Sequence, residues 1–212
     1  MRTLPSIVAL ARLGIPLLLC LTAALPAMAQ SPLPLRLDGS VTAFLAAPGR
    51  AAGCGLRVFG IESMPPPRST LRTVDLSVLL GPEAFVQGVG MVKASSFETT
   101  AAAMKAGQPT RPFTVTDGWL RVPGVAQTRA APGASLAPDE SPQVHRYLAD
   151  AAALFAVLDA VLEGRAIEVS IERSGLPSHP VYAGVVQLAP QDRTQFVACM
   201  RDLQQQAQAR KR

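Results

Sequence analysis

The segment from Leu71 to Leu80 (LRTVDLSVLL) alternates cleanly between apolar and polar residues. The apolar positions are Val74, Leu76, Val78 and Leu80, and the polar positions are Thr73, Asp75 and Ser77. Successive side chains of a strand point to opposite faces, so the pattern predicts a strand that covers a core with one face only. A chain containing such a strand must build a sheet and must supply other elements to cover its apolar face.

Other segments have the composition of strands. They are Gly53 to Glu62, Phe85 to Ser95, Phe113 to Val122, and a hairpin made by Ile167 to Glu172 and Val181 to Leu188. Gly53 to Glu62 has apolar residues or glycine in both alternating sets, which favours a strand buried on both faces. Leu35 to Leu45 fits a short strand or a short helix, and Thr99 to Ala106 fits a short helix or an exposed loop.

Two longer segments have helical periodicity. Ser141 and Pro142 suit the N-cap and first position of a helix whose apolar residues recur at three- and four-residue steps as far as Glu163, with Gly164 as its C-cap. A second helix is predicted from Pro190. Its apolar residues are Phe196, Val197, Met200 and Leu203, and a polar C-terminal tail (QQQAQARKR) follows.

These elements predict an α+β fold in which a mostly antiparallel sheet or sandwich of about six or seven strands packs against two principal helices. Helices are too few between the strands for a parallel, doubly wound sheet. We expect one domain over residues 30–212. Within it, residues 123–141 are rich in Pro, Gly, Ala and Ser, which predicts a flexible loop.

The first 29 residues have the organisation of a secretory signal peptide. Arg2 and Arg12 precede or flank the apolar stretch from Gly14 to Leu25, and the small residues of the A-M-A sequence end at Ala29. Signal peptidase accepts small side chains at such positions, so we predict cleavage between Ala29 and Gln30. Removal of both arginines would lower the formal net charge of the chain from +5 to +3.

Two alternatives to a cleaved signal stay open. An uncleaved anchor needs roughly 20 apolar residues in a row, whereas Pro16 and Pro26 interrupt this stretch. A lipoprotein would be acylated at Cys20, but leucines rather than small residues precede that cysteine. No later apolar run is long enough to span a membrane, which excludes a polytopic membrane protein. The prediction is therefore a periplasmic or secreted protein without a membrane span after cleavage.

Export also sets the expected state of the cysteines. Of the three cysteines, Cys20 would leave with the signal, and Cys54 and Cys199 would remain. Two cysteines in an oxidising compartment usually pair, so we predict one disulfide between them. Two buried free thiols are the alternative. A redox catalyst is disfavoured because no C-x-x-C sequence is present.

The sequence contains no recognisable catalytic or metal-binding constellation. Its two histidines are His145, expected in the first turn of the long helix, and His179, expected in a hairpin loop beside Ser178. A local Ser-His pair does not have the geometry of an activated nucleophile. Glu168 and Glu172 are read as a solvated strand face rather than as a glycosidase pair. We therefore predict no catalytic residue, no metal site and no cofactor.

Charge gives a weak indication of partners. The calculated isoelectric point is about 9.6, but the basic residues form a cluster only at Arg210, Lys211 and Arg212. Nucleic-acid binding needs a basic stripe or an aromatic stacking platform, so it is not expected. Adhesion of this terminal cluster to an anionic membrane surface is an alternative role for it.

Residues 158–203 resemble the ending of one family of periplasmic proteins. The order of helix, glycine, strand, loop, strand and final helix is similar to that of the invasion-associated locus B type of proteobacterial protein. The resemblance rests on Leu162-x-Gly164, on Ile167, Val169 and Ile171, and on the final helix around Phe196. It implies a periplasmic protein, and it carries no catalytic residue because that family has no catalytic motif to match.

The sequence thus favours a non-enzymatic exported protein, periplasmic or secreted, that serves as a binding or accessory protein of the bacterial cell envelope. Its expected partner is another envelope or secreted protein. The alternative is a small exported hydrolase that uses scattered acids or His179.

Overall fold

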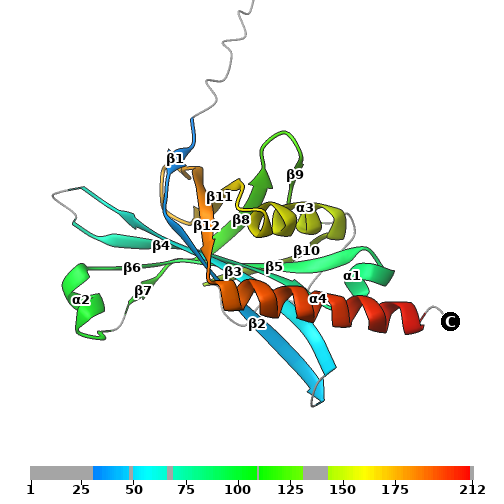
Figure 1. Ribbon diagram of the computed structural model, residues 1–212. Helices are drawn as coiled ribbons and strands as arrows, with labels where there is room; N and C mark the ends of the chain where they lie inside the picture. Colours follow the sequence, from blue (N-terminus) through cyan, green and yellow to red (C-terminus); the bar gives the residue numbers. More distant parts are fainter. Residues whose placement is uncertain (1–30, 48–49, 66–68, 109, 131–142, 211–212) are drawn as a thin grey trace, which may run out of the picture.

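The computed structural model describes residues 31–47, 50–65, 69–108, 110–130 and 143–210. Figure 1 shows its strands and helices. The strands are β1 (Leu33–Pro34), β2 (Leu37–Ala47), β3 (Arg50–Ser63), β4 (Leu71–Leu80), β5 (Val89–Ser95), β6 (Phe97–Thr99), β7 (Arg111–Pro112), β8 (Val115–Val122), β9 (Ala126–Gln127), β10 (Val144–Asp150), β11 (Ala166–Arg173) and β12 (Tyr182–Leu188). The helices are α1 (Glu83–Val86), α2 (Ala101–Lys105), α3 (Ala151–Leu162) and α4 (Pro190–Arg210).

All twelve strands belong to one sheet. Its main path runs β10-β5-β4-β3-β2-β12-β11-β8-β9, while β1 pairs with β12 and β6 pairs with β4 and β7. The pairs β1–β12 and β12–β2 are parallel, and the other pairs are antiparallel. The fold is α+β and mostly antiparallel, but the predicted count of six or seven strands is wrong, and the sheet is mixed.

The undercount has a physical cause. Strands β1, β7 and β9 have two residues each and β6 has three. Segments of that length are too short to show a periodic pattern, so only pairing with a neighbour defines them. Strand β2 includes most of the segment from Leu35 to Leu45, for which the sequence fits either a strand or a helix. Strand β10 lies where the sequence predicts a helix.

The sheet curls until its two ends meet. Ala130, just after β9 at one end, forms an antiparallel bridge with Ala149 of β10 at the other end. At this seam the hydroxyl oxygens of Tyr147 and Thr128 lie 2.9 Å apart, and the backbone N–H of Leu120 donates to the Thr128 hydroxyl at 3.0 Å. Burial of the Tyr147 side chain raises its pKa to about 12, against the effect of its hydrogen bond to Thr128.

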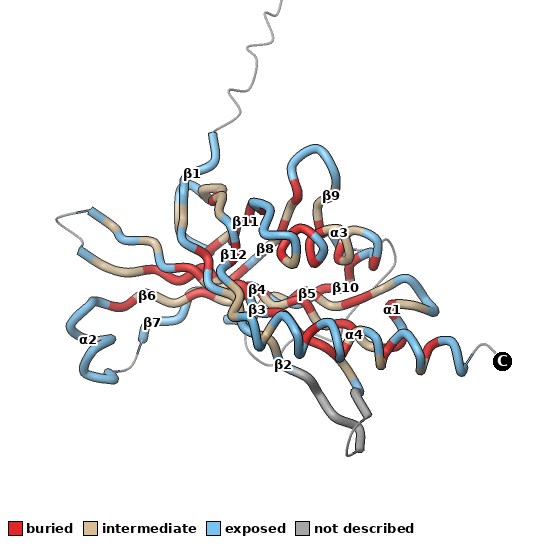
Figure 2. The backbone as a smooth tube through the Cα atoms, viewed as in Figure 1, coloured by how far each residue is buried: buried red, intermediate tan, exposed pale blue. Residues whose placement is uncertain are grey.

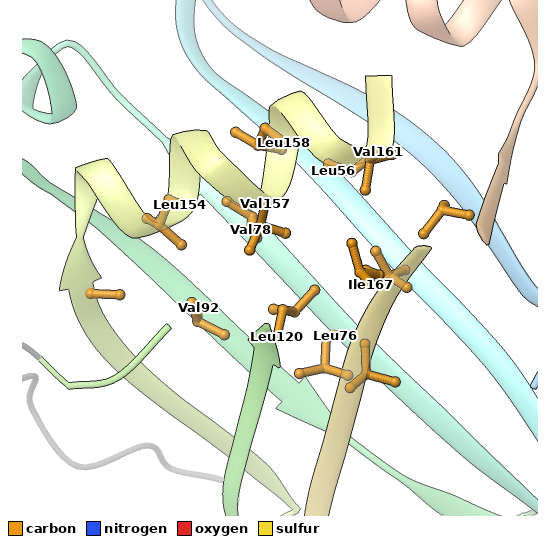
Figure 3. Packing of buried hydrophobic residues seen from close by; sticks show 14 of the residues in the cluster. Leu56, Leu76, Val78, Val92, Leu120, Leu154, Val157, Leu158, Val161 and Ile167 are labelled. Carbon is orange, nitrogen blue, oxygen red and sulfur yellow. The ribbon is translucent and has the colours of Figure 1, made fainter. Parts of the chain in front are cut away.

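The inner face of the curled sheet carries the core. Figure 3 shows Leu154, Val157 and Val161 of α3 directed at apolar side chains of the sheet, Val92 and Ile167 among them. All five side chains are fully buried. Removal of this apolar area from water is the main favourable contribution to folding.

Helix α4 covers the same face of the sheet as α3. Cys54 on β3 is bonded to Cys199 of α4, and Leu56, two residues further along β3, packs in the core below α3. Residues two apart on a strand point to the same side. Both long helices therefore cover one face, while the shorter α1 and α2 contain four and five residues.

Strand β4 has the predicted bounds and the predicted faces. Val74, Leu76 and Val78 are fully buried, whereas Asp75 on the other face accepts two hydrogen bonds from the exposed Arg57. The prediction for the neighbouring Gly53 to Glu62 is wrong in one respect. Arg57 lies on the outer face of β3, whose residues alternate along the strand with the buried ones, so this strand is buried on one face only. Figure 2 shows the buried residues concentrated where the strands cross at the centre of the molecule.

The long helix is shorter than predicted. It begins at Ala151, where the Asp150 side chain accepts hydrogen bonds from the N–H groups of Ala152 and Ala153 as the N-cap. The preceding seven residues form β10 and pair with β5 along their whole length. The predicted caps Ser141 and Pro142 lie outside the described residues.

The structure also defines the bounds of the remaining segments. The segment beginning at Phe85 first forms α1 and becomes a strand only at Val89. The segment from Thr99 to Ala106 contains α2, and residues 123–141 contain β9, with 131–142 outside the described residues. The last helix includes most of the predicted polar tail, because α4 continues to Arg210.

Candidate ligand-binding site

The predicted disulfide is present. Cys54 and Cys199 are bonded, with their Cα atoms 6.0 Å apart and 145 residues between them in sequence. The bond fixes α4 to β3 across the core. The predicted cleavage residues Ala29 and Gln30 lie outside the described residues, so the cleavage site stays a prediction.

Each histidine ring has a polar contact that needs no catalytic role: a carboxylate for His145 and a backbone N–H for His179. His145 lies on β10 rather than in a helix, with its Nε2 3.7 Å from an oxygen of Asp117. The Nδ1 of His179 accepts a hydrogen bond of 3.3 Å from the backbone N–H of Arg173. In the described ranges, neither ring is hydrogen-bonded to a serine, threonine or cysteine side chain. Ser178, which is too close in sequence for His179 to activate, is thus not hydrogen-bonded to the His179 ring in the described residues.

The prediction that Glu168 lies on a solvated strand face is wrong. Its side chain is 11% exposed and forms an ion pair with Arg121, the residue opposite it on β8. The Arg121 guanidinium also lies 5.1 Å from the centre of the Trp119 ring. Glu172 is intermediate in exposure. Both acids thus lie on a partly covered face of β11.

Within the part of the chain that the structure describes, no group of three or more His, Cys, Asp or Glu residues is arranged to hold a metal ion. The described helices also include none that is both long and apolar enough to cross a membrane.

A row of alternating charges crosses the end of the sheet beside α2 (left in Figure 1). Glu62 of β3 lies opposite Arg72 of β4, Arg72 lies opposite Glu98 of β6, and Glu98 lies opposite Arg111 of β7. Residues in register on neighbouring strands point to the same face. The four side chains therefore follow one another along a single face, and we call them the charge row.

The centre of the charge row is an ion pair between two largely buried side chains, Arg72 and Glu98. The Nε of Arg72 donates to Glu98 Oε2 at 2.9 Å, and the two side chains are 8% and 18% exposed. The Thr70 hydroxyl donates to the same oxygen at 3.3 Å. Burial raises the pKa of Glu98, but the hydrogen bond and charge of Arg72, with smaller effects of Thr70 and Arg111, outweigh burial and leave the pKa lowered.

Arg173 of β11 inserts beside the inner end of the row. Its side chain is 1% exposed, its Nε donates to Ser96 Oγ at 2.8 Å, and its Nη2 donates to the carbonyl of Thr73 at 3.0 Å. Its Nη1 lies 4.0 Å from Glu62 Oε2. Burial lowers the pKa of Arg173, while the nearby Tyr182 and Glu62 act in the opposite direction. An arginine still keeps its charge at neutral pH.

Two buried oxygens beside Arg173 lack hydrogen-bond partners among the described residues. They are Oε2 of Glu62 and the hydroxyl of Tyr182. Burial raises the pKa of Tyr182, and the neighbouring Glu62 raises it further, while Arg173 partly offsets both effects. We call Arg173, Glu62 and Tyr182 the inner group. It is enclosed and charged, and two of its oxygens lack a hydrogen-bond partner among the described residues.

Phe113 contacts the inner group and also lines a cavity. The guanidinium carbons of Arg72 and Arg173 lie 5.7 and 5.8 Å from the centre of its ring. The cavity has a volume of about 550 Å³, and its lining is mainly charged and hydroxyl-bearing. It is lined by Thr70, Arg72, Glu98, Arg111, Pro112, Phe113, Thr114, Ser174, Gly175 and Leu176. We call this cavity the polar pocket.

A second hollow, of about 400 Å³, lies between α3 and α4 and is mainly apolar. Phe155 and Leu162 of α3, Phe196 and Met200 of α4 and Phe85 of α1 contribute to its walls. The two hollows differ in the chemistry of a ligand that they would accept. The apolar hollow includes Asp159, Arg201 and Gln204 in its lining, but apolar side chains form most of it. Charged and hydroxyl-bearing side chains make up most of the lining of the polar pocket, which makes it the better candidate for specific binding.

The polar pocket is not evident in the amino-acid sequence. Its charged residues lie on three different strands, two of which have no more than three residues. Each charge looks like an ordinary surface residue in the sequence. The available signal was Arg173, a charge at a position that should point inward if Ile167, Val169 and Ile171 form the apolar face of β11.

Comparison of the chain with protein-family models, with curated proteins and with solved structures gave no match. The resemblance of residues 158–203 to the invasion-associated locus B type of protein therefore stays a prediction.

Proposed function

We propose that this chain is an exported, non-enzymatic binding or accessory protein of the bacterial cell envelope, periplasmic or secreted, whose ligand occupies the polar pocket. The predicted secretory signal supports export, and the Cys54–Cys199 disulfide is compatible with an oxidising compartment. Its partner is another envelope or secreted protein, which presents or receives the bound group.

The observation that carries the proposal is the construction of the polar pocket. Arg72 and Glu98 hold each other in place, and strand register fixes the positions of Glu98 and Arg111 on the same face. Such polar groups are ordered before a ligand arrives, so binding has a smaller ordering cost. The volume of about 550 Å³ lies in the range typical of small-molecule sites.

The chemistry of the pocket favours binding over catalysis. The Thr70 hydroxyl donates its hydrogen bond to Glu98, which already accepts one from Arg72. This carboxylate is therefore held in its ionised form by two donors, which makes it a weak base. A hydrolase would need a nucleophile activated by an adjacent base.

Binding is tested by an NMR screen of small neutral, anionic and cationic fragments against the chain labelled with ¹⁵N. We expect at least one fragment to shift the amide signals of Thr114, Ser174 and Gly175, which line the pocket. Thr114→Trp should abolish that binding by filling the space. Thr116→Trp is the matched control, because Thr116 is also exposed and does not line the pocket.

Two results would contradict the proposal. One is a screen in which no fragment of any charge shifts the pocket amides. The other is hydrolysis of ester, amide, glycoside or phosphate-ester substrates by the purified protein that is lost in His179→Ala. The second result would instead support the small exported hydrolase.

A further inference from the structure

We propose that the polar pocket selects an oxyanion, a carboxylate or a phosphate, attached to an apolar or aromatic group, and that Arg111 is the residue that binds it. This inference rests on the proposed function, because it names the ligand class of the same site.

The first argument is the balance of charges. Glu98 is paired with Arg72, and Glu62 is the acid nearest to Arg173. Arg111 is exposed, lines the pocket and has no ion-pair partner within 4.0 Å among the described residues. The pocket and the inner group together therefore carry one uncompensated positive charge, and it lies at the open end of the row.

The second argument is the ionisation of Glu98. Because Arg72 and Thr70 keep the pKa of this carboxyl lowered, Glu98 does not change its charge near neutral pH. Its negative charge is already matched by Arg72 at 2.9 Å, so a cationic ligand would have to compete with that arginine. An anionic ligand meets Arg111 without displacing any described ion pair.

The third argument is the shape and chemistry of the walls. The Arg111 guanidinium offers a planar pair of donors that matches a carboxylate or a phosphate. The hydroxyls of Thr114 and Ser174 line the same space as additional donors. The half-buried Phe113 ring supplies an apolar wall for the body of the ligand.

The experiment compares four probes of similar size by isothermal titration calorimetry. Benzoate and phenyl phosphate are anionic, benzamide is the neutral analogue and benzamidine is the cationic analogue. We expect at least one anion to bind about tenfold or more tightly than benzamide, as a charge-assisted hydrogen bond allows, and benzamidine to bind least. Binding of benzoate alone identifies a carboxylate ligand, and binding of phenyl phosphate alone identifies a phosphate ligand.

Arg111→Ala should weaken binding of that anion by about tenfold or more. Arg129→Ala is the control, since it removes the same charge from an exposed residue beyond β9. It should leave the affinity nearly unchanged. Arg111→Lys keeps the charge but loses the planar fork, so it should retain phenyl phosphate better than benzoate. Circular dichroism checks that each variant remains folded.

The anion proposal is overturned if benzamide or benzamidine binds as tightly as the anions, if none of the four probes binds, or if Arg111→Ala and Arg129→Ala have equal effects. The first of these results would leave the proposed function intact, because a ligand would still occupy the pocket. The proposed function itself fails only in the fragment screen or through hydrolase activity, so the two failures are distinguishable.

Discussion

At the scale of single residues, Arg173 is the largest side chain among those that the fold buries completely. Taking a guanidinium out of water is costly unless its donors are used. Here Ser96 and Thr73 accept two hydrogen bonds, and Glu62 supplies a nearby negative charge. The residue therefore links β11 to β3 and β4 at the inner end of the charge row.

Arg173→Ala should lower the free energy of unfolding by about 3–5 kcal/mol, because it leaves the buried Oε2 of Glu62 without the nearby positive charge of Arg173. Equilibrium urea denaturation measures the loss. Adding Glu62→Gln to this variant should restore part of the stability, since the unpaired charge is removed. A loss under about 1 kcal/mol for Arg173→Ala would mean that the charge is not held as described.

Glu98 should make stability depend on pH. A carboxyl whose pKa is lowered by folding stabilises the protein above its unfolded pKa of about 4.3, and this contribution disappears as pH falls through the lower folded pKa. Chemical denaturation of the wild type and of Glu98→Gln should therefore differ most near neutral pH. The difference should shrink below about pH 4. A difference that grows on acidification would contradict the lowered pKa.

Residues differ in how far the sequence predicts their roles. The Cys54–Cys199 pair was predictable because cleavage of the predicted signal would leave two cysteines, which have one possible partner each. The pairing of Arg72 with Glu98 was not predictable, because it depends on the register between β4 and β6. A shift of one residue in that register would turn one side chain to the other face.

At the scale of elements, the junction between β10 and α3 shows how one segment can satisfy two patterns. The spacing of Tyr147, Leu148 and Ala151 is that of an apolar helical face and predicts a helix. The residues from Val144 to Asp150 instead pair with β5 along its length, which satisfies their backbone groups in a sheet. Tertiary pairing overrides local preference here. Asp150 then provides the N-cap that starts α3.

Neighbouring residues of α3 allow a matched test of this packing. Leu154 is fully buried in the core, whereas Phe155 is partly exposed at the hollow between α3 and α4, with its ring centre 5.3 Å from that of Phe85. Leu154→Ala should cost about 2–5 kcal/mol in unfolding free energy. Phe155→Ala should cost less, no more than about 2 kcal/mol, because less apolar area leaves the core. Denaturation curves in which Phe155→Ala is the more harmful change would contradict the observed orientation of α3.

At the scale of the whole molecule, the curl of the sheet brings strands from distant parts of the chain into contact. Gly118 of β8 lies against Ala94 of β5, and a Cβ at residue 118 would lie 2.5 Å from the Ala94 Cβ. No side chain fits between these strands without displacement. The close approach closes the fold on the side where Ala130 and Ala149 form their bridge.

Gly118→Ala should therefore destabilise the protein by about 1–3 kcal/mol through overpacking. Ala94→Gly added to it should recover part of that loss, because it removes the atom that the new methyl group meets. A thermodynamic cycle of the two single variants and the double variant measures the coupling. Additive effects would mean that the two strands do not approach each other as closely as described.

Export and the single disulfide can be tested together by intact mass spectrometry of the protein recovered from the periplasm or culture medium of a Gram-negative bacterium. We expect a chain that begins at Gln30 and is lighter by two hydrogen atoms than its reduced form, with Cys54 and Cys199 unreactive to alkylation before reduction. A chain that begins at Met1, or one with both thiols free, would contradict this expectation.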